Sequence, residues 1–165
     1  MTTIVFSIVT NVQFAALVEQ FDKDCFPEEM WLRKEDIEAS IAKGAIGVVG
    51  RIDDQDICFG ILIGELAEAD DLKEFDPQFN PSADNMYSYS VAVHPKFQEM
   101  GSGKKLVLEM KRIAKKSGAK HLTAHVRTAN DWHSRRARLL DPQIRRIVKD
   151  AWEIDGDVEF QSVEL

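Results

Sequence analysis

Residues 91–106 limit the fold of this chain more than any other segment. They read Val-Ala-Val-His-Pro-Lys-Phe-Gln-Glu-Met-Gly-Ser-Gly-Lys-Lys-Leu, in which an apolar strand precedes a proline, two closely spaced glycines and an amphipathic pattern. A helix that starts at the glycines leaves its first backbone N–H groups without intrahelical partners, at the positive end of the helix dipole. Glycine also lets the backbone approach a bound anion closely. The segment therefore predicts a strand, a turn and a helix that together bind a pyrophosphate.

The spacing of apolar residues elsewhere predicts an alternation of helices and strands. Four helices are expected: one that Asn11 caps and Pro27 ends, and others over 33–43, from the two glycines to Gly118, and over 133–140. Strands are expected over 3–9, 45–52, 57–66, 86–93 and 122–127, followed by a hairpin that turns at Asp155-Gly156 between 146–154 and 158–163.

The connections between these strands predict how they pair. A short polar turn joins 45–52 to 57–66, so these two strands should be antiparallel. A helix joins 86–93 to 122–127, so these two should be parallel. Residues 67–85 are acidic and contain two prolines, and we expect them to form a loop. The pattern is that of a mixed α/β sheet.

Length and cysteine content indicate one domain in a reducing compartment. With 165 residues and 44% apolar content, residues 1–165 can form a single domain around one core. Two cysteines cannot build a disulfide framework, and no apolar segment is long enough to span a bilayer, so we expect a cytoplasmic protein without a membrane partner. The histidines and cysteines do not show the clustered spacing of a metal site, and no metal is expected.

The net charge of −7 is unevenly distributed. Residues 96–149 carry +11, whereas the remainder of the chain carries −18. A basic segment around a phosphate site suits a polyanionic cofactor, and acidic surroundings favour a cationic second ligand. Nucleic acid is not expected as a partner, because no aromatic side chains are interleaved with the basic ones. A dinucleotide would require three glycines and an acidic residue after the next strand, and Arg127-Thr128-Ala129-Asn130 stands there instead.

The motif resembles that of the GCN5-related N-acetyltransferases, the GNAT family. Their diagnostic segment appears here as Val91-x-Val93-x-Pro95 followed by Gln98-x-x-Gly101-x-Gly103, and Asn130 lies at the family's usual distance downstream. The order of predicted elements also fits over most of the chain. The resemblance implies an α/β fold with about seven mostly antiparallel strands, a central splayed parallel pair and about four helices.

The resemblance also implies that acetyl-CoA is the co-substrate. By analogy with the family, the backbone of Val91, Ala92 and Val93 would pair with the pantetheine arm, and the side-chain amide of Asn130 would contact that arm. The pyrophosphate would be wrapped by the turn and the first residues of the helix, namely Gln98, Glu99, Met100, Gly101, Ser102, Gly103 and Lys104.

The catalytic residues depart from the family's pattern. Many relatives carry a tyrosine seven residues beyond the asparagine as the acid that protonates the departing thiolate, and that position here is Ala137. Four side chains remain as candidates for the acid, and spacing favours none of them: Tyr87, Tyr89, His133 and Ser134. The first candidate for the base is His125, where some relatives carry a glutamate, and the second is Glu65 at the end of a strand.

These features predict an acetyl-CoA-dependent N-acetyltransferase that acts by direct transfer to a primary amine. The acceptor should be cationic, either a small amine or a protein lysine or N-terminus, because acidic residues gather in one region: Glu65, Glu68, Asp70, Asp71, Glu74 and Asp76. The alternative is a non-catalytic acyl-CoA-binding or protein-interaction module, which the missing tyrosine motivates. The sequence leaves open whether the protein forms a homodimer.

Overall fold

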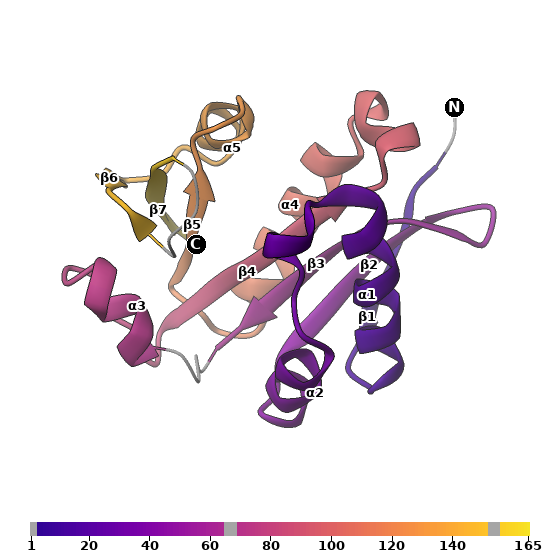
Figure 1. The fold of residues 1–165 in the computed structure, drawn as a ribbon, viewed down its shortest axis with the longest axis horizontal. Coiled ribbons are helices and arrows are strands. Elements are labelled where there is room, and N and C mark those ends of the chain that lie inside the picture. The colour runs from indigo at the N-terminus through magenta and orange to yellow at the C-terminus, as the bar shows by residue number, and fades with distance from the viewer. Residues whose placement is uncertain (1–2, 65–68, 152–155) are drawn as a thin grey trace. The chain divides into compact units, whose positions relative to one another are not determined.

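The computed structural model describes residues 3–64, 69–151 and 156–165, over which helices and strands alternate (Figure 1). The described strands are β1 (Val5–Val9), β2 (Ile46–Ile52), β3 (Gln55–Ile63), β4 (Asn85–Val93), β5 (His121–Arg127), β6 (Ile144–Val148) and β7 (Val158–Glu164). The described α-helices are α1 (Gln13–Cys25), α2 (Lys34–Ala42), α3 (Ala69–Phe75), α4 (Ser102–Lys116) and α5 (Trp132–Leu140), and two 3₁₀ helices are η1 (Glu28–Met30) and η2 (Pro95–Met100). In this part of the chain, no helix combines the length and the apolar character needed to cross a membrane.

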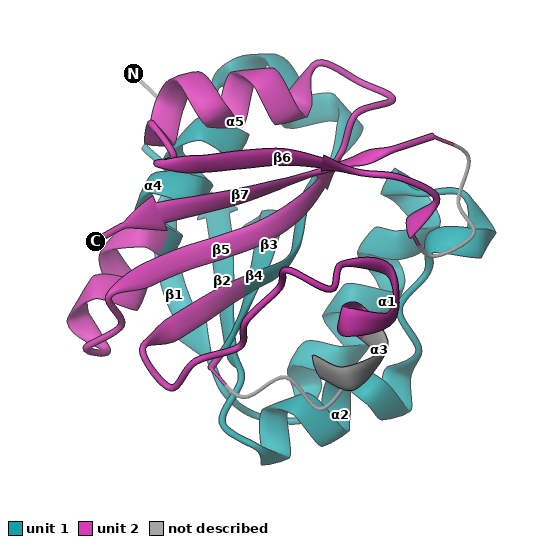
Figure 2. Cartoon of the chain, turned by 90° about the vertical axis from the view of Figure 1, so that its left-hand side faces the viewer, with its two compact units in different colours: residues 1–63, 88–110 teal, residues 64–87, 111–165 magenta. Residues whose placement is uncertain are grey.

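The chain divides into two compact units, each made of two separate segments (Figure 2). The first unit contains residues 1–63 and 88–110, and the second contains residues 64–87 and 111–165. Hydrogen bonds order the seven described strands as β1-β2-β3-β4-β5-β7-β6, with β4 contributing residues to both units. The prediction that residues 1–165 form a single domain stays a prediction.

The first unit is held together by antiparallel strands and aromatic packing. Strand β1 pairs with β2, and β2 pairs with β3 from Ile46↔Leu62 to Ile52↔Gln55, so the predicted hairpin is confirmed. The amphipathic pattern of α1 buries Phe14 and Phe21, whose rings meet the ring of Phe59 edge to face at centroid distances of 5.9 and 5.4 Å. Such aromatic pairs contribute to stability beyond the area they bury.

The second unit contains the parallel strand pair. Strands β4 and β5 run parallel over three residue pairs, from Asn85↔His121 to Tyr87↔Thr123, which confirms the prediction. Strand β7 pairs antiparallel with β5 on one side and with β6 on the other. The buried apolar side chains of β5 and β7 alternate with polar ones that are also buried, so this unit encloses several charged groups.

Two predictions about local structure were wrong. Residues 67–85 do not form a loop throughout, because they contain α3, in which Leu72 is buried. The high acidic content and the prolines at 77 and 81 obscured the helical spacing of Leu72 and Phe75. Strand β6 covers Ile144–Val148 and does not continue over residues 149–151, as the predicted strand over 146–154 did. Residues 152–155, which include part of the predicted turn at Asp155-Gly156, lie outside the described residues.

Candidate active site

The turn after β4 is a compact 3₁₀ helix that ends at a left-handed glycine. The His94 carbonyl accepts the Phe97 N–H at 2.8 Å, and His94 Nδ1 accepts the Lys96 N–H at 3.3 Å. Gly101 follows at φ +73°, a conformation that favours glycine, and Ser102 then begins α4. The buried Ser102 hydroxyl donates to the Phe97 carbonyl at 3.1 Å, so it faces the turn.

The start of α4 has the features of an anion site. Its first helical hydrogen bond runs from the Lys105 N–H to the Gly101 carbonyl at 3.1 Å, so helix geometry leaves the N–H groups of residues 102–104 without intrahelical partners. A Cβ at Gly101 would meet nothing within 4 Å, which leaves space beside the turn. The exposed Lys104 adds positive charge. These residues fit the pyrophosphate that the sequence motif predicts.

Gln98 ties this turn back to the strand. Its side-chain amide donates to the Val93 carbonyl at 3.1 Å, and the Cys25 thiol lies 3.7 Å from the same oxygen. Ala92 is buried, whereas Val91 and Val93 are partly exposed. The Gln98 side chain therefore links the turn to the end of β4 and stabilises the conformation of the turn. The predicted cofactor contacts of residues 91–93 and 98–104 stay predictions.

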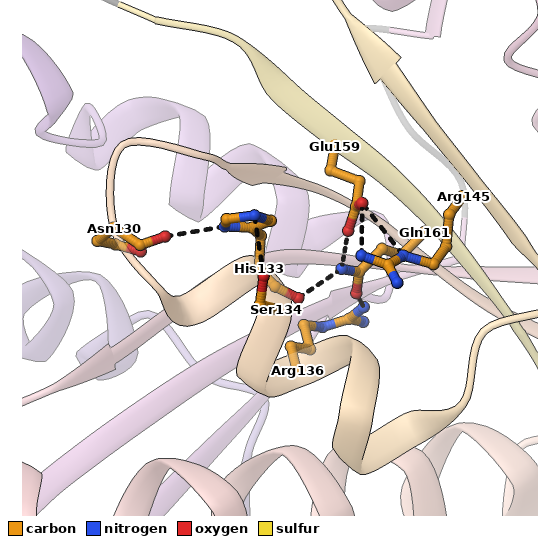
Figure 3. Close-up of polar contacts among 7 residues, drawn as sticks. All are labelled: Asn130, His133, Ser134, Arg136, Arg145, Glu159 and Gln161. Carbon is orange, nitrogen blue, oxygen red and sulfur yellow. Dashed lines mark hydrogen bonds and ion pairs between the residues drawn. The ribbon is translucent and has the colours of Figure 1, made fainter.

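Asn130 lies in the second unit, just before α5. Its side-chain oxygen accepts the Trp132 N–H at 3.0 Å, and its carbonyl lies 2.8 Å from Nδ1 of His133 (Figure 3). The other ring nitrogen of His133 lies 3.1 Å from the Ser134 hydroxyl. Asn130 therefore holds the beginning of α5, and its predicted contact with the pantetheine arm stays a prediction.

His125 lies at the centre of a buried polar cluster in the second unit. Its Nδ1 is 2.8 Å from the Tyr87 hydroxyl, and its Nε2 is 2.8 Å from Oδ2 of Asp76. The His125 side chain is 0% exposed, and both ring nitrogens are engaged. Three phenylalanine rings enclose the imidazole at centroid distances of 5.1 to 6.1 Å: Phe75, Phe79 and Phe160.

The Asp76 carboxylate accepts hydrogen bonds from two side chains. Besides His125, it accepts a hydrogen bond from Nη2 of Arg146, whose guanidinium lies 3.8 Å from the centroid of the Phe160 ring. Burial raises the pKa of Asp76, but the hydrogen bonds from Arg146 and His125 outweigh burial, and the net shift is downward. Asp76 is therefore ionised and acts only as an acceptor.

Burial lowers the pKa of His125, and the nearby Asp76 carboxylate opposes that shift only in part. The imidazole is consequently neutral near pH 7 and can accept a proton. Because an ionised carboxylate only accepts hydrogen bonds, Nε2 carries the proton and Nδ1 accepts the Tyr87 hydroxyl.

Two further predictions concern the acidic residues expected to attract the acceptor, and Glu65, the second candidate for the base. Asp76 was predicted to line an acceptor site, but it is 2% exposed and serves His125 and Arg146 instead. Glu65, Glu68, Asp70 and Asp71 were predicted there too, and their side chains lie outside the described residues. Glu74 is exposed. Nothing in the sequence links Asp76 to His125, because the two are 49 residues apart.

A second buried network surrounds Arg136 of α5 (Figure 3). Its Nη1 donates to the Gln161 side-chain oxygen at 2.6 Å, while the Gln161 amide nitrogen donates to Glu159 at 2.6 Å and to the His133 carbonyl at 2.8 Å. Glu159 also accepts from Arg145 at 2.8 Å. Nη2 of Arg136 is buried without a hydrogen-bond partner. Burial lowers the pKa of Arg136 to about 10, and Tyr87 and Glu159 interact with it electrostatically.

The first unit contains a pocket of about 500 Å³ bounded by α1, η1 and the start of α2. Asp22 lies in its wall, accepts the Leu32 N–H at 2.7 Å through one carboxylate oxygen, and has no partner for the other. Burial raises the pKa of Asp22, although the Leu32 N–H opposes the shift. Within the described residues, no three His, Cys, Asp or Glu side chains are grouped as a metal ion requires.

Comparison with known proteins matches residues 14–136 to the model of the acetyltransferase (GNAT) family. Searching curated protein sequences finds no match.

Solved structures share the fold at low sequence identity. One is the ribosomal-protein-S18-alanine N-acetyltransferase from Escherichia coli, with 12% identity, a TM-score of 0.75, and coverage of 98% of this chain and 94% of that one. Arabidopsis thaliana NAA60 in complex with acetyl-CoA has 18% identity, a TM-score of 0.72 and coverage of 99% of both chains. The PaiA N-acetyltransferase from Thermoplasma acidophilum, in complex with coenzyme A, has 15% identity, a TM-score of 0.64 and coverage of 98% and 99%. These likenesses agree with the α/β fold predicted from the sequence.

Proposed function

Because the chain belongs to the acetyltransferase (GNAT) family, we propose that it transfers the acetyl group of acetyl-CoA directly to a primary amine. The observation that carries the proposal is the turn at Gly101, where left-handed backbone, open space and the free N–H groups of α4 meet. This arrangement suits the pyrophosphate of coenzyme A. Two structural relatives were determined with acetyl-CoA or coenzyme A, which supports the same co-substrate here.

The reaction requires that the acceptor ammonium lose a proton before its nitrogen can attack the thioester. We assign the base to His125, because it is neutral near pH 7 and is held in one orientation by two hydrogen bonds. Glu65 is the second candidate. When bound, acetyl-CoA supplies the acetyl group and a thiolate that is already a fair leaving group, so the demand for an acid is modest.

We propose a cationic acceptor, either a small amine or a protein lysine or N-terminus. The acidic residues of the segment that ends at Glu74 support this choice, because negative charge attracts a cationic ligand. We also propose that the protein acts in the cytoplasm. Cys25 and Cys58 are free thiols, and burial raises the pKa of each to about 11, so neither is prone to oxidation.

The cofactor proposal is tested by titrating acetyl-CoA while following thermal unfolding. A ligand at a hundred times its Kd should stabilise the native state by about 2.7 kcal/mol. Gly101→Ala should weaken binding at least tenfold, because the side chain enters the open space and strains a left-handed residue.

Gly118→Ala is the matched control. Gly118 lies at the other end of α4, has φ +85° and also has open space around it, so the two variants impose similar backbone strain. Acetyl-CoA should bind the Gly118→Ala protein as it binds the wild type. Equal affinity in both variants would show that the pyrophosphate site lies elsewhere.

The alternative function is a non-catalytic acyl-CoA-binding or protein-interaction module. One observation favours it: Ala137, at the position of the family's usual tyrosine, is a buried alanine on α5 that offers no proton. Measuring thiol release with a panel of polyamines, amino sugars and lysine-bearing peptides separates the two. Release of free thiol that depends on the amine supports the enzyme, whereas tight binding of acetyl-CoA without release supports the module.

A further inference from the structure

We propose that Ser134 is a nucleophile that His133 activates, and that it takes the acyl group of an activated carboxylic ester and passes it to water. This activity goes beyond the proposed acetyl transfer and does not depend on it. It follows from contacts at the first turn of α5, where the two side chains are paired (Figure 3). All residues of the site belong to the second unit.

The hydrogen bonds of His133 leave its Nε2 as an acceptor for the Ser134 hydroxyl. Nδ1 lies 2.8 Å from the Asn130 carbonyl oxygen. A carbonyl oxygen only accepts hydrogen bonds, so the proton of the neutral ring is on Nδ1 and the lone pair is on Nε2. Nε2 lies 3.1 Å from Oγ of Ser134 and accepts its proton. A hydroxyl bonded to a base that a third group orients is the arrangement in which serine attacks acyl carbons.

Buried side chains hold this turn of α5 in place. The Gln161 amide of β7 donates to the His133 carbonyl at 2.8 Å, and the Gln161 side-chain oxygen accepts from Arg136 at 2.6 Å (Figure 3). Gln161 and Arg136 are 0% and 1% exposed, so the backbone of the turn is fixed from inside the unit. His133 and Ser134 are themselves partly exposed. The pair is therefore rigidly supported and open to a ligand.

The start of α5 supplies donors for the negative charge that develops during acyl transfer. The first helical hydrogen bond runs from the Arg135 N–H to the Asp131 carbonyl at 3.0 Å, and the Trp132 N–H donates to Asn130. Helix geometry therefore leaves the N–H groups of residues 133–134 without intrahelical partners. Helical side chains lean toward the N-terminus, so an acyl group on the serine lies on the side of these donors. The donors and the helix dipole stabilise the oxyanion.

The bonds and protons of the reaction balance. As Oγ of Ser134 bonds to the acyl carbon, its proton moves to Nε2 of His133. The bond from the acyl carbon to the leaving oxygen then breaks, and the imidazolium gives its proton to that oxygen. In the second half, a solvent water attacks the acyl carbon and gives a proton to Nε2. The acyl carbon–Oγ bond breaks, and the imidazolium returns the proton to Oγ, which restores both side chains and yields a carboxylic acid.

The group that orients His133 limits the substrate to esters with weakly basic leaving groups. The Asn130 carbonyl carries only a partial charge, so it stabilises the imidazolium less than a carboxylate would. A weakly basic leaving group needs less help from that proton as it departs. We therefore expect aryl esters to react faster than alkyl esters.

The test follows the hydrolysis of p-nitrophenyl acetate without acetyl-CoA or amine. Ser134→Ala and His133→Gln should each lower the enzyme-dependent rate by about 10²-fold or more. His133→Gln keeps the backbone carbonyl that Gln161 contacts, and circular dichroism checks the fold of each variant.

Ser117→Ala is the matched control. The hydroxyl of this exposed serine donates to the Ile113 carbonyl rather than to an imidazole, so removing it should leave the rate within about twofold of the wild type.

A fluorophosphonate probe locates the nucleophile in the wild type without relying on a variant. Peptide mass spectrometry should find the probe on Ser134 and not on Ser117. The same mapping after p-nitrophenyl acetate should separate acyl-serine from acetylated lysines, which such esters also produce.

Two results would overturn the proposal: equal labelling of Ser117 and Ser134, or a Ser134→Ala or His133→Gln protein that keeps most of the wild-type rate. The proposed acetyl transfer is tested separately, by binding of acetyl-CoA and amine-dependent thiol release. Neither of those measurements uses an ester or the probe, so failure of one proposal is distinguishable from failure of the other.

Discussion

At the scale of single residues, the second unit depends on charges that are buried and paired. Arg136 shares Gln161 with Glu159, and His125 shares Asp76 with Arg146. Removing one partner from such a group leaves a charge without compensation, which costs more than removing the whole group. Sequence reasoning named His125 as a candidate base and Asp76 only as part of an acidic region. It did not connect either residue with Arg146, nor Arg136 with Gln161, because no spacing rule joins residues so far apart in the chain.

Gln161→Leu should lower the free energy of unfolding by about 3 kcal/mol or more, because Arg136 then loses its hydrogen-bond acceptor inside the protein. Urea unfolding followed by circular dichroism measures the change. The double variant Arg136→Leu/Gln161→Leu is the control, and it should recover part of the loss because the unpaired charge is gone. Strictly additive losses in the double-mutant cycle would show that the two side chains act independently.

Stability should depend on pH through His125. Its pKa in the folded protein lies below the ordinary histidine value of 6.5, because burial disfavours the charged ring, so the unfolded state binds more protons just beneath pH 6.5. The stability that neutral His125 contributes is present above that value and is lost as pH falls toward the folded pKa. Asp76, whose pKa lies below 3.8, contributes in the same sense at still lower pH.

The free energy of unfolding should therefore be higher near about pH 7.5 than near about pH 5, where the unfolded chain takes up a proton at this histidine. Urea titrations at several pH values measure the slope. His125→Gln, which has no titrating ring, should flatten it between those values. An unchanged slope in that variant would assign the effect to other groups.

At the scale of elements, the two ends of α5 are fixed by Asn130 at the beginning and Asp141 at the end. Asn130 holds the first turn through the Trp132 N–H, and Asp141 ends the helix in a left-handed conformation at φ +50°. That conformation favours glycine, which has no Cβ to strain. Asp141 therefore occupies a position whose backbone conformation glycine adopts with less strain.

Asp141→Gly should raise the free energy of unfolding by about 0.5–1 kcal/mol, because glycine adopts the left-handed cap without strain. For a chain of this size, that corresponds to a gain in Tm of about 1–4 °C. Asp141→Ala serves as the comparison and should lower stability, since alanine tolerates this conformation less well than aspartate. Calorimetry of the three proteins gives the order, and a more stable alanine variant would contradict the explanation.

Helix α3 shows where element prediction fails. Its seven residues include three acidic ones, so its average composition resembles that of a loop. The burial of Leu72 and the contact of the Phe75 ring with His125 show that it packs within the folded unit. The helix is followed directly by Asp76, so its formation brings that carboxylate to the imidazole of His125. Periodicity over seven residues is too short a signal to predict such a helix.

At the scale of the whole molecule, the uneven charge should make co-substrate binding depend on salt. Residues 96–149 carry +11 in a chain whose net charge is −7, and coenzyme A is a polyanion. Salt screens such attraction over a Debye length of about 10 Å at 0.1 M. We expect the Kd for acetyl-CoA to rise several-fold between about 0.05 and about 0.5 M NaCl, as measured by calorimetric titration.

S-acetylpantetheine is the control for this prediction. It keeps the thioester and the arm but lacks the pyrophosphate and the ribose phosphate, so its Kd should hardly change with salt. Equal salt dependence of the two ligands would show that the phosphates do not contribute to the attraction.

The sequence by itself determined the alternation of strands and helices, the parallel pairing of β4 and β5, and the turn at Gly101. These are local properties, because they follow from residue periodicity and from the conformational freedom of glycine within a few positions. The tertiary structure decided the surroundings of His125. The pKa of that ring depends on burial, on Asp76 just after α3 and on Arg146 of β6, which only the folded chain brings together. Residues 91–106 thus predicted the kind of ligand from the sequence, while the chemistry proposed for it depends on contacts across 49 and 70 positions of the chain.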